Sequence, residues 1–452
     1  MKVLDKRNLP GERLSTTDEK GKRVYIFPEA VKGFYQKSRT IVQAVLIIIF
    51  LMVPWIKVGG YQALLFDVID KKISIFGLNF WYHDAPLIFF ILGILTIGLA
   101  FVTAVWGRIW CGWGCPQTVF IDGVFRRIER LVIGSHIKQR LLARSPMDRN
   151  KIFKYSLKWF LFLLVSLLVA HSFLAYFVGA ERIITMTQGD PREHWTIFLF
   201  MLFITAVILF DFGWFREQFC IIMCPYGRFQ SALLDENSMN VAYDFNRGEP
   251  RKGVAESIEA EGDCINCYKC VSVCPTGIDI RNGLQLECIA CTACMDACDE
   301  VMEKIDRPKG LIRYETEAGL SGKKTHFLRS RTAIYAVLLL VFFSGLTFAV
   351  SKRQDVAYTV LRAKDSPYTI VKDTNDNDFI INHFKLHVNN QSFEDKALMI
   401  GLEDASIPEN MELITQDNNI NVLPGKDSTV HFFVKFPAEF ISNGGGVKIL
   451  KL

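Results

Sequence analysis

Long apolar stretches alternate with polar, charged segments along most of the chain. Five stretches are long enough to span a bilayer, which needs about 20 residues and tolerates about 17 when flanking groups reach the interface. They are residues 40–57, 86–106, 159–180, 195–214 and 332–351. Their lengths favour membrane spans over buried core helices, although Gln43 and Pro54 weaken the first stretch and Asp211 lies near the end of the fourth.

The pattern becomes strand-like beyond residue 351. Apolar and polar residues alternate at 380–388 and again at 430–436, which is the period-two pattern of half-buried strands. Turn-forming residues lie between such runs, at Asn389-Asn390, at 425–427 and at 444–446. Residues 352–452 are therefore expected to form a small β-sandwich outside the membrane.

Composition supports a membrane protein. The 452 residues are 50% hydrophobic and include 36 Phe, which is too apolar for a typical soluble protein of two domains. All 12 cysteines lie between Cys111 and Cys298, and this clustering argues against a secreted disulfide framework. The first 39 residues are polar and basic, so we expect no cleavable signal peptide.

The basic residues are distributed unevenly, although the net charge is only +5. Ten Lys and Arg precede the first span and ten more lie at 108–154, whereas the loops at 59–85 and 181–194 contain two each. The loop at 216–331 is again rich in basic residues. By the positive-inside rule, the N-terminus is cytoplasmic and the C-terminus external in a bacterial inner membrane.

A cysteine repeat marks the long loop. Residues 264–275 read CINCYKCVSVCP and residues 288–298 read CIACTACMDAC, so each of four cysteines recurs 24 positions later. This is the run of bacterial dicluster ferredoxins, in which three cysteines hold one [4Fe–4S] cluster and the fourth ligates the other. The expected ligands are Cys264, Cys267, Cys270 and Cys298 for cluster 1, and Cys288, Cys291, Cys294 and Cys274 for cluster 2.

Two details qualify this prediction. Structural zinc is the alternative, but the third closely spaced cysteine of each run is surplus to a tetrahedral ribbon site. Asp299 follows the second run where such runs usually have proline. Its carboxylate would at most lower the local potential, because negative charge near a cluster opposes reduction.

A second repeat follows two of the spans. Residues 106–120 read WGRIWCGWGCPQTVF and residues 215–229 read FREQFCIIMCPYGRF, and both contain Cys-x3-Cys-Pro. If each helix continues through its motif, the two thiols of a pair lie one turn apart on one face. The four cysteines expected together at the cytoplasmic boundary are Cys111, Cys115, Cys220 and Cys224.

Four soft thiolates at this boundary would suit Cu(I), zinc or a further cluster. Arg108, Arg216 and Arg228 lie nearby in the sequence and are expected to favour thiol deprotonation. Reduced packing cysteines and thiol-redox switching are the alternatives.

Taken together, the spans with duplicated Cys-x3-Cys-Pro, the dicluster loop, a further span and an external β domain resemble the FixG/CcoG (RdxA) family of cytochrome oxidase accessory proteins. The resemblance covers nearly the whole chain and implies an immunoglobulin-like C-terminal fold. Members of the family support assembly of cbb3-type haem–copper oxidases. The resemblance therefore implies reduction of Cu(II) to Cu(I), with copper at the thiols of Cys111, Cys115, Cys220 and Cys224.

The expected protein is a multi-domain membrane protein. The expected segments are a cytoplasmic segment at 1–39, four transmembrane helices at 40–230, a cytoplasmic region at 231–331 with the ferredoxin-like module at about 258–305, a fifth helix at 332–351 and an external β domain at 352–452. Expected partners are membrane lipid, a cytoplasmic electron donor, a copper chaperone or transporter, and oxidase assembly factors. A quinol-oxidising conduit to a periplasmic reductase and a non-redox assembly scaffold are the alternatives.

Several residues suggest other roles that we consider weaker. His171, His83 and His194 lie in or near spans, but haem would need two facing imidazoles. Asp211 is expected to be a solvated helix terminus. The basic cluster of Arg126, Arg127 and Arg130 directly follows a span, so we assign it to anionic lipid headgroups and expect no nucleic-acid partner.

Overall fold

The computed structural model of the protein describes most of the chain. The described residues are 16, 23–68, 72–81, 85–253, 261–352, 356–363, 368–372, 378–390, 392, 395–401, 411–415, 419–423 and 426–438. The chain divides into two compact units. One comprises Met1–Ile56, Leu64–Ile69 and Pro86–Leu346, and the other comprises Lys57–Ala63, Asp70–Ala85 and Thr347–Leu452.

Among the described residues, five helices are long and apolar enough to cross a membrane. They span Phe34–Trp55, Leu87–Trp106, Arg149–Val178, Trp195–Phe215 and Ser330–Ser351. They are built on α1 (Phe34–Met52), α2 (Ala85–Trp106), α7 (Arg149–Val178), α9 (Trp195–Phe210) and α15 (Ser330–Ser351). The first helix begins before residue 40 and the third before residue 159, because polar residues extend both beyond their apolar cores.

Two of these helices pack closely through glycines. A Cβ on Gly93 of α2 would collide with the ring of Phe342 on α15, and a Cβ on Gly345 would lie 2.5 Å from the ring of Phe90. At one end of the pair, the Arg329 guanidinium donates a 2.6 Å hydrogen bond to the carbonyl of Ala104. Small residues thus let α2 and α15 approach each other, as they do in membrane helix pairs.

Shorter elements connect these helices. The remaining helices of the first unit are α3 (Ile109–Trp113), α4 (Pro116–Phe120), α5 (Arg126–Val132), α6 (His136–Arg144), α8 (Ala180–Gln188), α10 (Pro225–Leu233), α11 (Phe245–Gly248), α12 (Lys269–Ser272), α13 (Ala293–Lys304) and α14 (Glu317–Leu320). The π-helical segments are η4 (Ile121–Phe125), η5 (Asp211–Phe215) and η6 (Phe219–Met223), and the 3₁₀ turns are η2 (Val53–Trp55) and η8 (Ile280–Asn282). Strand β3 (Leu64–Asp67) follows α1.

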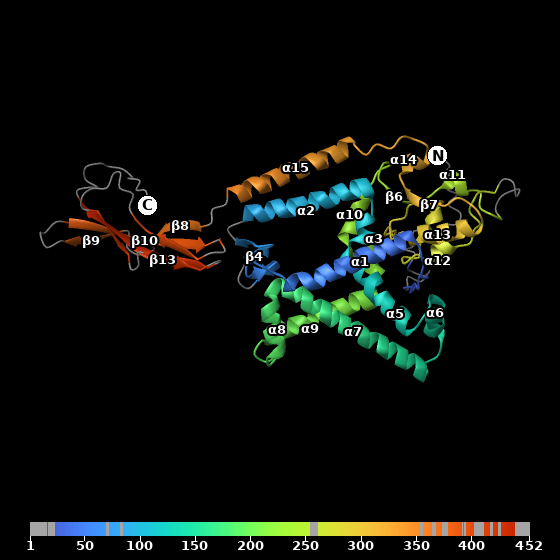
Figure 1. Ribbon diagram of the computed structural model, residues 1–452, viewed down its shortest axis with the longest axis horizontal. Coiled ribbons are helices and arrows are strands. Elements are labelled where there is room, and N and C mark those ends of the chain that lie inside the picture. Colours follow the sequence, from blue (N-terminus) through green and yellow to red (C-terminus); the bar gives the residue numbers. More distant parts are fainter. Residues whose placement is uncertain are drawn as a thin grey trace. The chain divides into compact units, whose positions relative to one another are not determined.

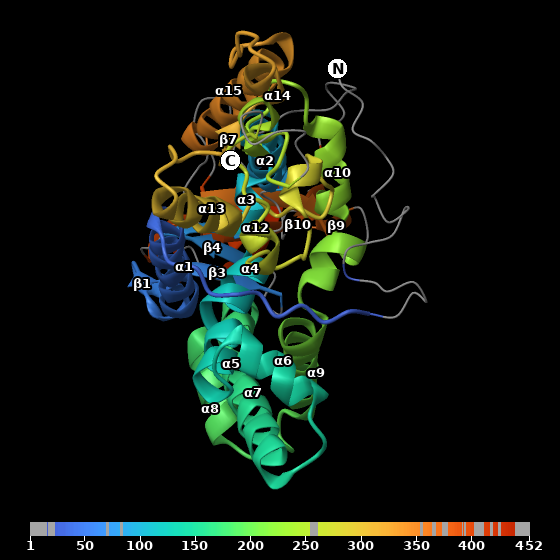
Figure 2. The same cartoon turned by 90° about the vertical axis from the view of Figure 1, so that its right-hand side faces the viewer.

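The cysteine-rich loop folds into a small module. Strands β6 (Asn240–Tyr243) and β7 (Ile312–Glu315) pair antiparallel and enclose α12 and α13 in the sequence. Figures 1 and 2 both place this module next to α3 and the beginning of α1. Its core contains Tyr243, Met295 and Ile312, together with Cys264 and Cys270.

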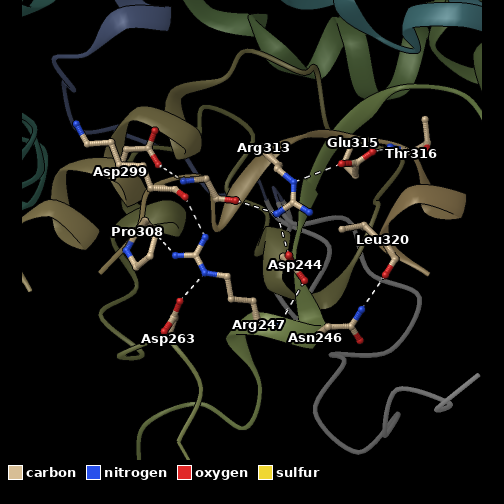
Figure 3. Close-up of polar contacts among 12 residues, drawn as sticks. Asp244, Asn246, Arg247, Asp263, Asp299, Pro308, Arg313, Glu315, Thr316 and Leu320 are labelled. Carbon is tan, nitrogen blue, oxygen red and sulfur yellow. Dashed lines mark hydrogen bonds and ion pairs between the residues drawn. The ribbon is translucent and has the colours of Figure 1, made fainter. Parts of the chain in front are cut away.

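Polar contacts hold the periphery of the module (Figure 3). The Arg247 guanidinium donates to a carboxylate oxygen of Asp263 at 2.5 Å, and Arg313 donates to Asp244 at 2.8 Å. Asp299 accepts a 2.8 Å hydrogen bond from the backbone N–H of Gly310. The carboxylate that replaces the usual proline therefore has a structural partner in the segment leading to β7.

The second unit contains the C-terminal β domain. One sheet has the order β12-β14-β10-β8, with β9 also paired to β10, and a second sheet contains β11 and β13. The strands are β8 (Val356–Arg362), β9 (Thr369–Lys372), β10 (Asp378–Asn390), β11 (Lys396–Met399), β12 (Glu412–Thr415), β13 (Asn419–Val422) and β14 (Asp427–Pro437). Two hairpins complete the unit: β1 (Lys57–Val58) with β2 (Tyr61–Gln62), and β4 (Lys72–Ile75) with β5 (Leu78–Trp81).

The alternating runs form the two longest strands of this domain. Ile380 lies opposite Phe436, and Leu386 lies opposite Val430. The predicted turn at Asn389-Asn390 is wrong, because both residues continue β10 and pair with neighbouring strands. The buried Asn390 amide donates a 2.8 Å hydrogen bond to the Val422 carbonyl, so tertiary contacts outweigh its turn preference. The predicted turn at 444–446 lies outside the described residues.

Candidate functional site

The two ferredoxin-like cysteine runs have the same unusual backbone. Asn266 and Tyr268 have φ values of 59° and 56°, and Ala290 and Thr292, at the equivalent positions of the second run, have 50° and 63°. Left-handed conformations cost of order 1–3 kcal/mol in residues other than glycine, so the surrounding structure must enforce them. These residues flank Cys267 in the first run and Cys291 in the second, and they reverse the chain immediately before α12 or α13 begins.

This backbone gathers the eight cysteines around two pockets. One is lined by Cys264, Cys267, Cys270 and Cys298, and the other by Cys274, Cys288, Cys291 and Cys294, with Cys270 lining both pockets. Their empty volumes, open solvent included, are similar at ≈ 360 and ≈ 350 Å³. The pockets thus contain the two sets expected from spacing, and their ligation of iron stays a prediction.

The arrangement of donors fits clusters better than single ions. Within the described part of the chain, no three His, Cys, Asp or Glu side chains converge closely enough to hold one metal ion. Structural zinc would need four ligands around one ion, whereas a [4Fe–4S] cube binds its four thiolates through separate iron atoms. Helix α13 also begins at the second pocket, and a helix N-terminus favours a negatively charged group.

The buried thiols resist ionisation on their own. Burial is the main cause that raises the pKa of Cys270 and Cys298 to about 12 and that of Cys288 to about 11. Metal binding must therefore displace protons from these thiols. Cys267 differs because it is the exposed member of the 12 cysteines, so the first pocket is the one nearer to solvent.

The Cys-x3-Cys-Pro motifs do not continue the preceding helices, so the condition for placing the two thiols of a pair on one helical face is not met. Gly107, with φ 57°, ends α2, and a short helix α3 contains Cys111. Cys115 and Cys224 are extended, with φ/ψ of −66°/126° and −67°/112°. Each caps a new helix, α4 or α10, that starts with proline, because proline suits the first helical position and disfavours helix before it.

The structure nevertheless places the four thiols within electrostatic range of one another. Burial raises the pKa of Cys111 to about 12 and also raises that of Cys220, with further contributions from the neighbouring thiols of the set. Arg108 lowers the pKa of Cys111, as expected, but by less than burial raises it. Arg216 instead pairs with Glu129 at 2.6 Å, and Arg228 donates to the Ile222 carbonyl.

The first of these motifs contacts the loop of the second pocket. Cys111 and Cys220 pack against the hydrophobic cluster that contains Cys291. Gly112 lies so close that a Cβ there would be 2.5 Å from the Ala290 carbonyl oxygen. The buried Arg108 guanidinium donates to the Cys288 carbonyl at 3.0 Å and to the carbonyl of Leu286. The first Cys-x3-Cys-Pro motif and the second ferredoxin-like run are thus in direct contact, although about 180 residues separate them in sequence.

One polar residue at this contact was missed by the sequence analysis. Gln230 of α10 is fully buried, and its Oε1 accepts a 3.5 Å hydrogen bond from the Cys111 thiol. Its Nε2 has no hydrogen-bond partner in the described structure. Gln230 lies less than two turns after the helix-capping Cys224, and this helical spacing was the only available signal.

Buried ion pairs surround the same contact. Asp122 accepts from Arg39 and from Arg126 at 2.5 Å each, and Arg126 also pairs with Glu217. Burial alone would raise the pKa of Asp122, but the two arginines hold it well below its usual range. The Arg39 Nε donates a 2.7 Å hydrogen bond to the Gly112 carbonyl. The assignment of Arg126 to lipid headgroups is therefore wrong, because Asp122 and Glu217 sequester its charge inside the protein.

Of the other residues considered in the sequence analysis, Asp211 and His171 form hydrogen bonds within the protein. Asp211 accepts a 2.9 Å hydrogen bond from the amide of Gln117, so it is not simply a solvated helix end. The His171 Nδ1 pairs with the Leu167 carbonyl one turn earlier, and His194 is exposed at the start of α9. His83 lies outside the described residues.

Comparisons with known families cover most of the chain. A family described as "4Fe-4S dicluster domain" matches residues 215–317. A second, described as "4Fe-4S binding domain", matches residues 87–135 and 193–235, which contain both Cys-x3-Cys-Pro motifs. A third, described as an "IG-like fold at C-terminal of FixG", matches residues 346–449. The predicted fold class of membrane helices, ferredoxin-like module and immunoglobulin-like domain is confirmed.

Similar curated proteins are also found. Protein RdxA of Cereibacter sphaeroides is 35% identical over 405 residues, covering 85% of this chain and 83% of RdxA. Protein RdxB of the same organism is 35% identical over 374 residues, covering 78% of this chain and 77% of RdxB. Nitrogen fixation protein FixG of Rhizobium meliloti is 38% identical over 310 residues, covering 65% of this chain and 58% of FixG. No solved structure matches this chain.

Proposed function

This chain is a membrane-associated iron–sulfur electron-transfer protein that belongs to the FixG/RdxA family, and we propose that it reduces Cu(II) to Cu(I) for the assembly of a cbb3-type cytochrome c oxidase. The electron would come from a low-potential one-electron donor in the cytoplasm, and the copper ion is the substrate. When bound, two [4Fe–4S] clusters would supply one-electron transfer.

The contact between the two cysteine motifs carries the proposal. Cys111 and Cys220 pack against the hydrophobic residues that surround Cys291, and the Gly112 backbone approaches the Ala290 carbonyl without an intervening side chain. Electron transfer needs donor and acceptor to be close together. The exposed Cys267 at the first pocket, the buried second pocket and the Cys-x3-Cys-Pro thiols then form an ordered series from solvent to the membrane helices.

The proposed copper site would need to adjust to its substrate. The thiols of Cys111, Cys115, Cys220 and Cys224 interact electrostatically, yet no three of them converge around one ion in the described structure. Soft thiolates favour Cu(I) over harder divalent ions, and the proton lost from each buried thiol would accompany binding. A site that is not already closed around the ion suits a substrate that must leave.

The proposed orientation places the ferredoxin-like module in the cytoplasm and the β domain in the periplasm. Lysine and arginine are concentrated in the segments at 1–39, 108–154 and 216–331, which supports this topology. In Figure 1, the beginning of α1, the beginning of α15 and the end of α2 lie on the same side as α12 and α13. The basic segments adjoin these three helix ends, so the arrangement agrees with the proposed orientation.

The test is single-turnover copper reduction. Purified protein with intact clusters is reduced anaerobically with dithionite, desalted and mixed with Cu(II), and a Cu(I)-specific chromogenic chelator reports the product. We expect rapid Cu(I) formation, and a Cys111→Ser/Cys220→Ser variant with unchanged ferredoxin-type signals should be at least about tenfold slower. Equal rates in both proteins, or no Cu(I) from the wild type, would contradict the proposal.

A further cluster is the competing assignment for the Cys-x3-Cys-Pro thiols. It is favoured by the match of a 4Fe-4S binding family to both segments that contain them. Iron analysis separates the two assignments, because a further cluster adds iron that the Cys111→Ser/Cys220→Ser variant loses. Iron equivalent to two clusters, unchanged in that variant, supports the copper assignment.

A further inference from the structure

A large pocket adjoins the second ferredoxin-like run outside the proposed electron path. Its empty volume is ≈ 1040 Å³, part of which is open to solvent. Its walls come from the segment before α1, from α1 itself, from η4 and α5, and from the loops around Cys274 and Cys291.

The charge of this pocket is strongly positive. Its lining includes Lys32, Arg39, Arg126, Arg127 and Arg130, against Glu29 and Asp122. Both acids are already paired, Glu29 with Lys269 at 2.6 Å and Asp122 with Arg39 and Arg126. The Arg126 guanidinium also forms an ion pair with Glu217. Three cations therefore remain without a carboxylate partner in the described structure: Lys32, Arg127 and Arg130.

The two remaining arginines lie on one face of α5. Arg127 and Arg130 are three residues apart, which brings side chains together on a helix. Arg127 donates a 3.2 Å hydrogen bond to the Thr40 hydroxyl, and Arg130 has no hydrogen-bond or ion-pair partner among the described residues. Burial lowers the pKa of Arg130, and the neighbouring Arg126 and Arg127 lower it further, whereas the Asp122 and Glu129 carboxylates act in the opposite direction. An additional anion beside Arg127 and Arg130 would relieve the repulsion between these two cations.

We propose that this pocket binds a phosphate group through Arg127, Arg130 and Lys32. Paired guanidinium groups match the oxygens of a phosphate, and a lysine adds a further point charge. The phosphate can belong to an anionic phospholipid headgroup, since α5 follows a membrane helix, or to a soluble phosphorylated molecule. The inference does not depend on copper reduction.

The position of the pocket gives binding a measurable consequence. Cys291 lines both this pocket and the second cysteine pocket. A bound phosphate would place negative charge beside that loop, and negative charge opposes reduction of a nearby cluster. We therefore expect phosphate binding to lower the midpoint potential of one cluster and leave the other less affected.

The experiment uses full-length protein with both clusters, in nanodiscs of phosphatidylcholine or of phosphatidylglycerol. Inorganic phosphate is titrated and its binding measured by calorimetry, while redox titration followed by electron paramagnetic resonance reports the potentials. In phosphatidylcholine, Arg127→Gln/Arg130→Gln should weaken phosphate binding about tenfold or more. Arg130→Lys should recover part of the affinity. Arg149→Gln, an exposed arginine outside the pocket, is the matched control.

The lipid arm distinguishes the two sources of phosphate. If phosphatidylglycerol abolishes binding of inorganic phosphate and lowers the potential by itself, the headgroup occupies the pocket. If inorganic phosphate binds equally in both lipids and lowers the potential, the ligand is soluble. The proposal is overturned if phosphate and phosphatidylglycerol leave both potentials unchanged, or if the double variant binds phosphate as tightly as the Arg149→Gln control.

Discussion

At the scale of single residues, Gly112 decides how closely the two cysteine motifs approach. Its backbone lies against the carbonyls of Ile289 and Ala290, and any side chain would require these segments to separate. Arg108 and Arg39 reinforce the contact through backbone carbonyls on its two sides. Backbone groups thus make much of this contact, so a small change in side-chain volume has a large geometric effect.

Gly112→Ala should slow electron transfer to copper. The added Cβ would lie 2.5 Å from the Ala290 oxygen, a distance that forces the segments apart. We expect reoxidation of the reduced protein by Cu(II) to slow by roughly tenfold, since misplacement by about 1 Å can reduce rates strongly. Stopped-flow absorbance measures this rate. Gly98→Ala is the control, because its Cβ would make only an ordinary 3.9 Å contact with Leu339, and an equal effect there would refute the argument.

Arg108 should tune the cluster held by the second pocket. Its guanidinium donates to the Cys288 carbonyl, and its charge favours the thiolate of Cys288. Arg108→Gln removes positive charge, so the midpoint potential of this cluster should fall by roughly tens of millivolts. Redox titration followed by electron paramagnetic resonance tests the shift. Arg108→Lys should retain most of the wild-type potential, and an unchanged potential in Arg108→Gln would exclude this electrostatic role.

Asp122 should contribute stability that does not vary with pH near neutrality. Asp122→Asn leaves the buried arginines without their shared carboxylate, and breaking such pairs costs about 3–5 kcal/mol of unfolding free energy. The pKa of the wild-type carboxyl lies below its usual range. A lowered pKa gives stability that is present above the unfolded pKa, about 3.9, and is lost as pH falls through the folded pKa.

Chemical unfolding of the detergent-solubilised protein at several pH values measures this effect. The difference between wild type and Asp122→Asn should stay constant between about pH 5 and 8. Asp148→Asn, which changes the exposed cap of α7, provides a control for simple charge removal. A difference that disappears already at pH 5 would mean that the folded pKa is raised instead of lowered.

At the scale of elements, α13 connects the ferredoxin-like module to the first membrane helix. The Asp296 carboxylate of α13 accepts hydrogen bonds from the Tyr35 and Gln36 N–H groups at 3.2 and 2.7 Å. These are among the donors that a helix start leaves unpaired. Gly33 precedes them, and a Cβ there would collide with the same carboxylate. A residue 260 positions away thus caps α1, in a position that no local capping pattern reveals.

Asp296→Ala should destabilise this junction. Removal of a helix cap costs about 1 kcal/mol, and here two partly buried N–H groups lose their acceptor. We expect a lower midpoint in denaturant unfolding of the cluster-loaded protein, monitored by cluster absorbance. Asp296→Asn retains an acceptor oxygen and should lose less stability. If the alanine and asparagine variants unfold together with the wild type, the cap has no energetic importance.

At the scale of the whole molecule, the series of pockets predicts where electrons enter. Cys267 is exposed, and the second pocket contacts the Cys-x3-Cys-Pro motif. Cys267→Ser should therefore abolish reduction by a soluble one-electron donor while leaving the second cluster largely intact. After chemical reduction, Cu(I) yield per protein should fall to about half, because each [4Fe–4S] cluster stores one electron. Cys274→Ser is the reciprocal variant and should block transfer to copper instead.

Oxidase assembly provides the cellular measurement. A strain with Cys267→Ser should lose cbb3-type oxidase activity, and added copper should restore part of it if copper supply is the limiting step. Normal activity without copper supplementation would favour the non-redox scaffold. Loss of activity that copper does not restore would favour a role of the protein beyond metal supply.

The sequence by itself determined the parts that depend on local spacing. Cysteine intervals identified two sets of four thiols, apolar length identified five helices, and alternation identified β10 and β14, because each pattern follows from the geometry of one element. The tertiary structure decided the rest: the break at Cys115, the burial of Arg126, and the contact of Gly112 with Ala290. These depend on packing between segments far apart in the chain, and such packing leaves no periodic signal in either segment.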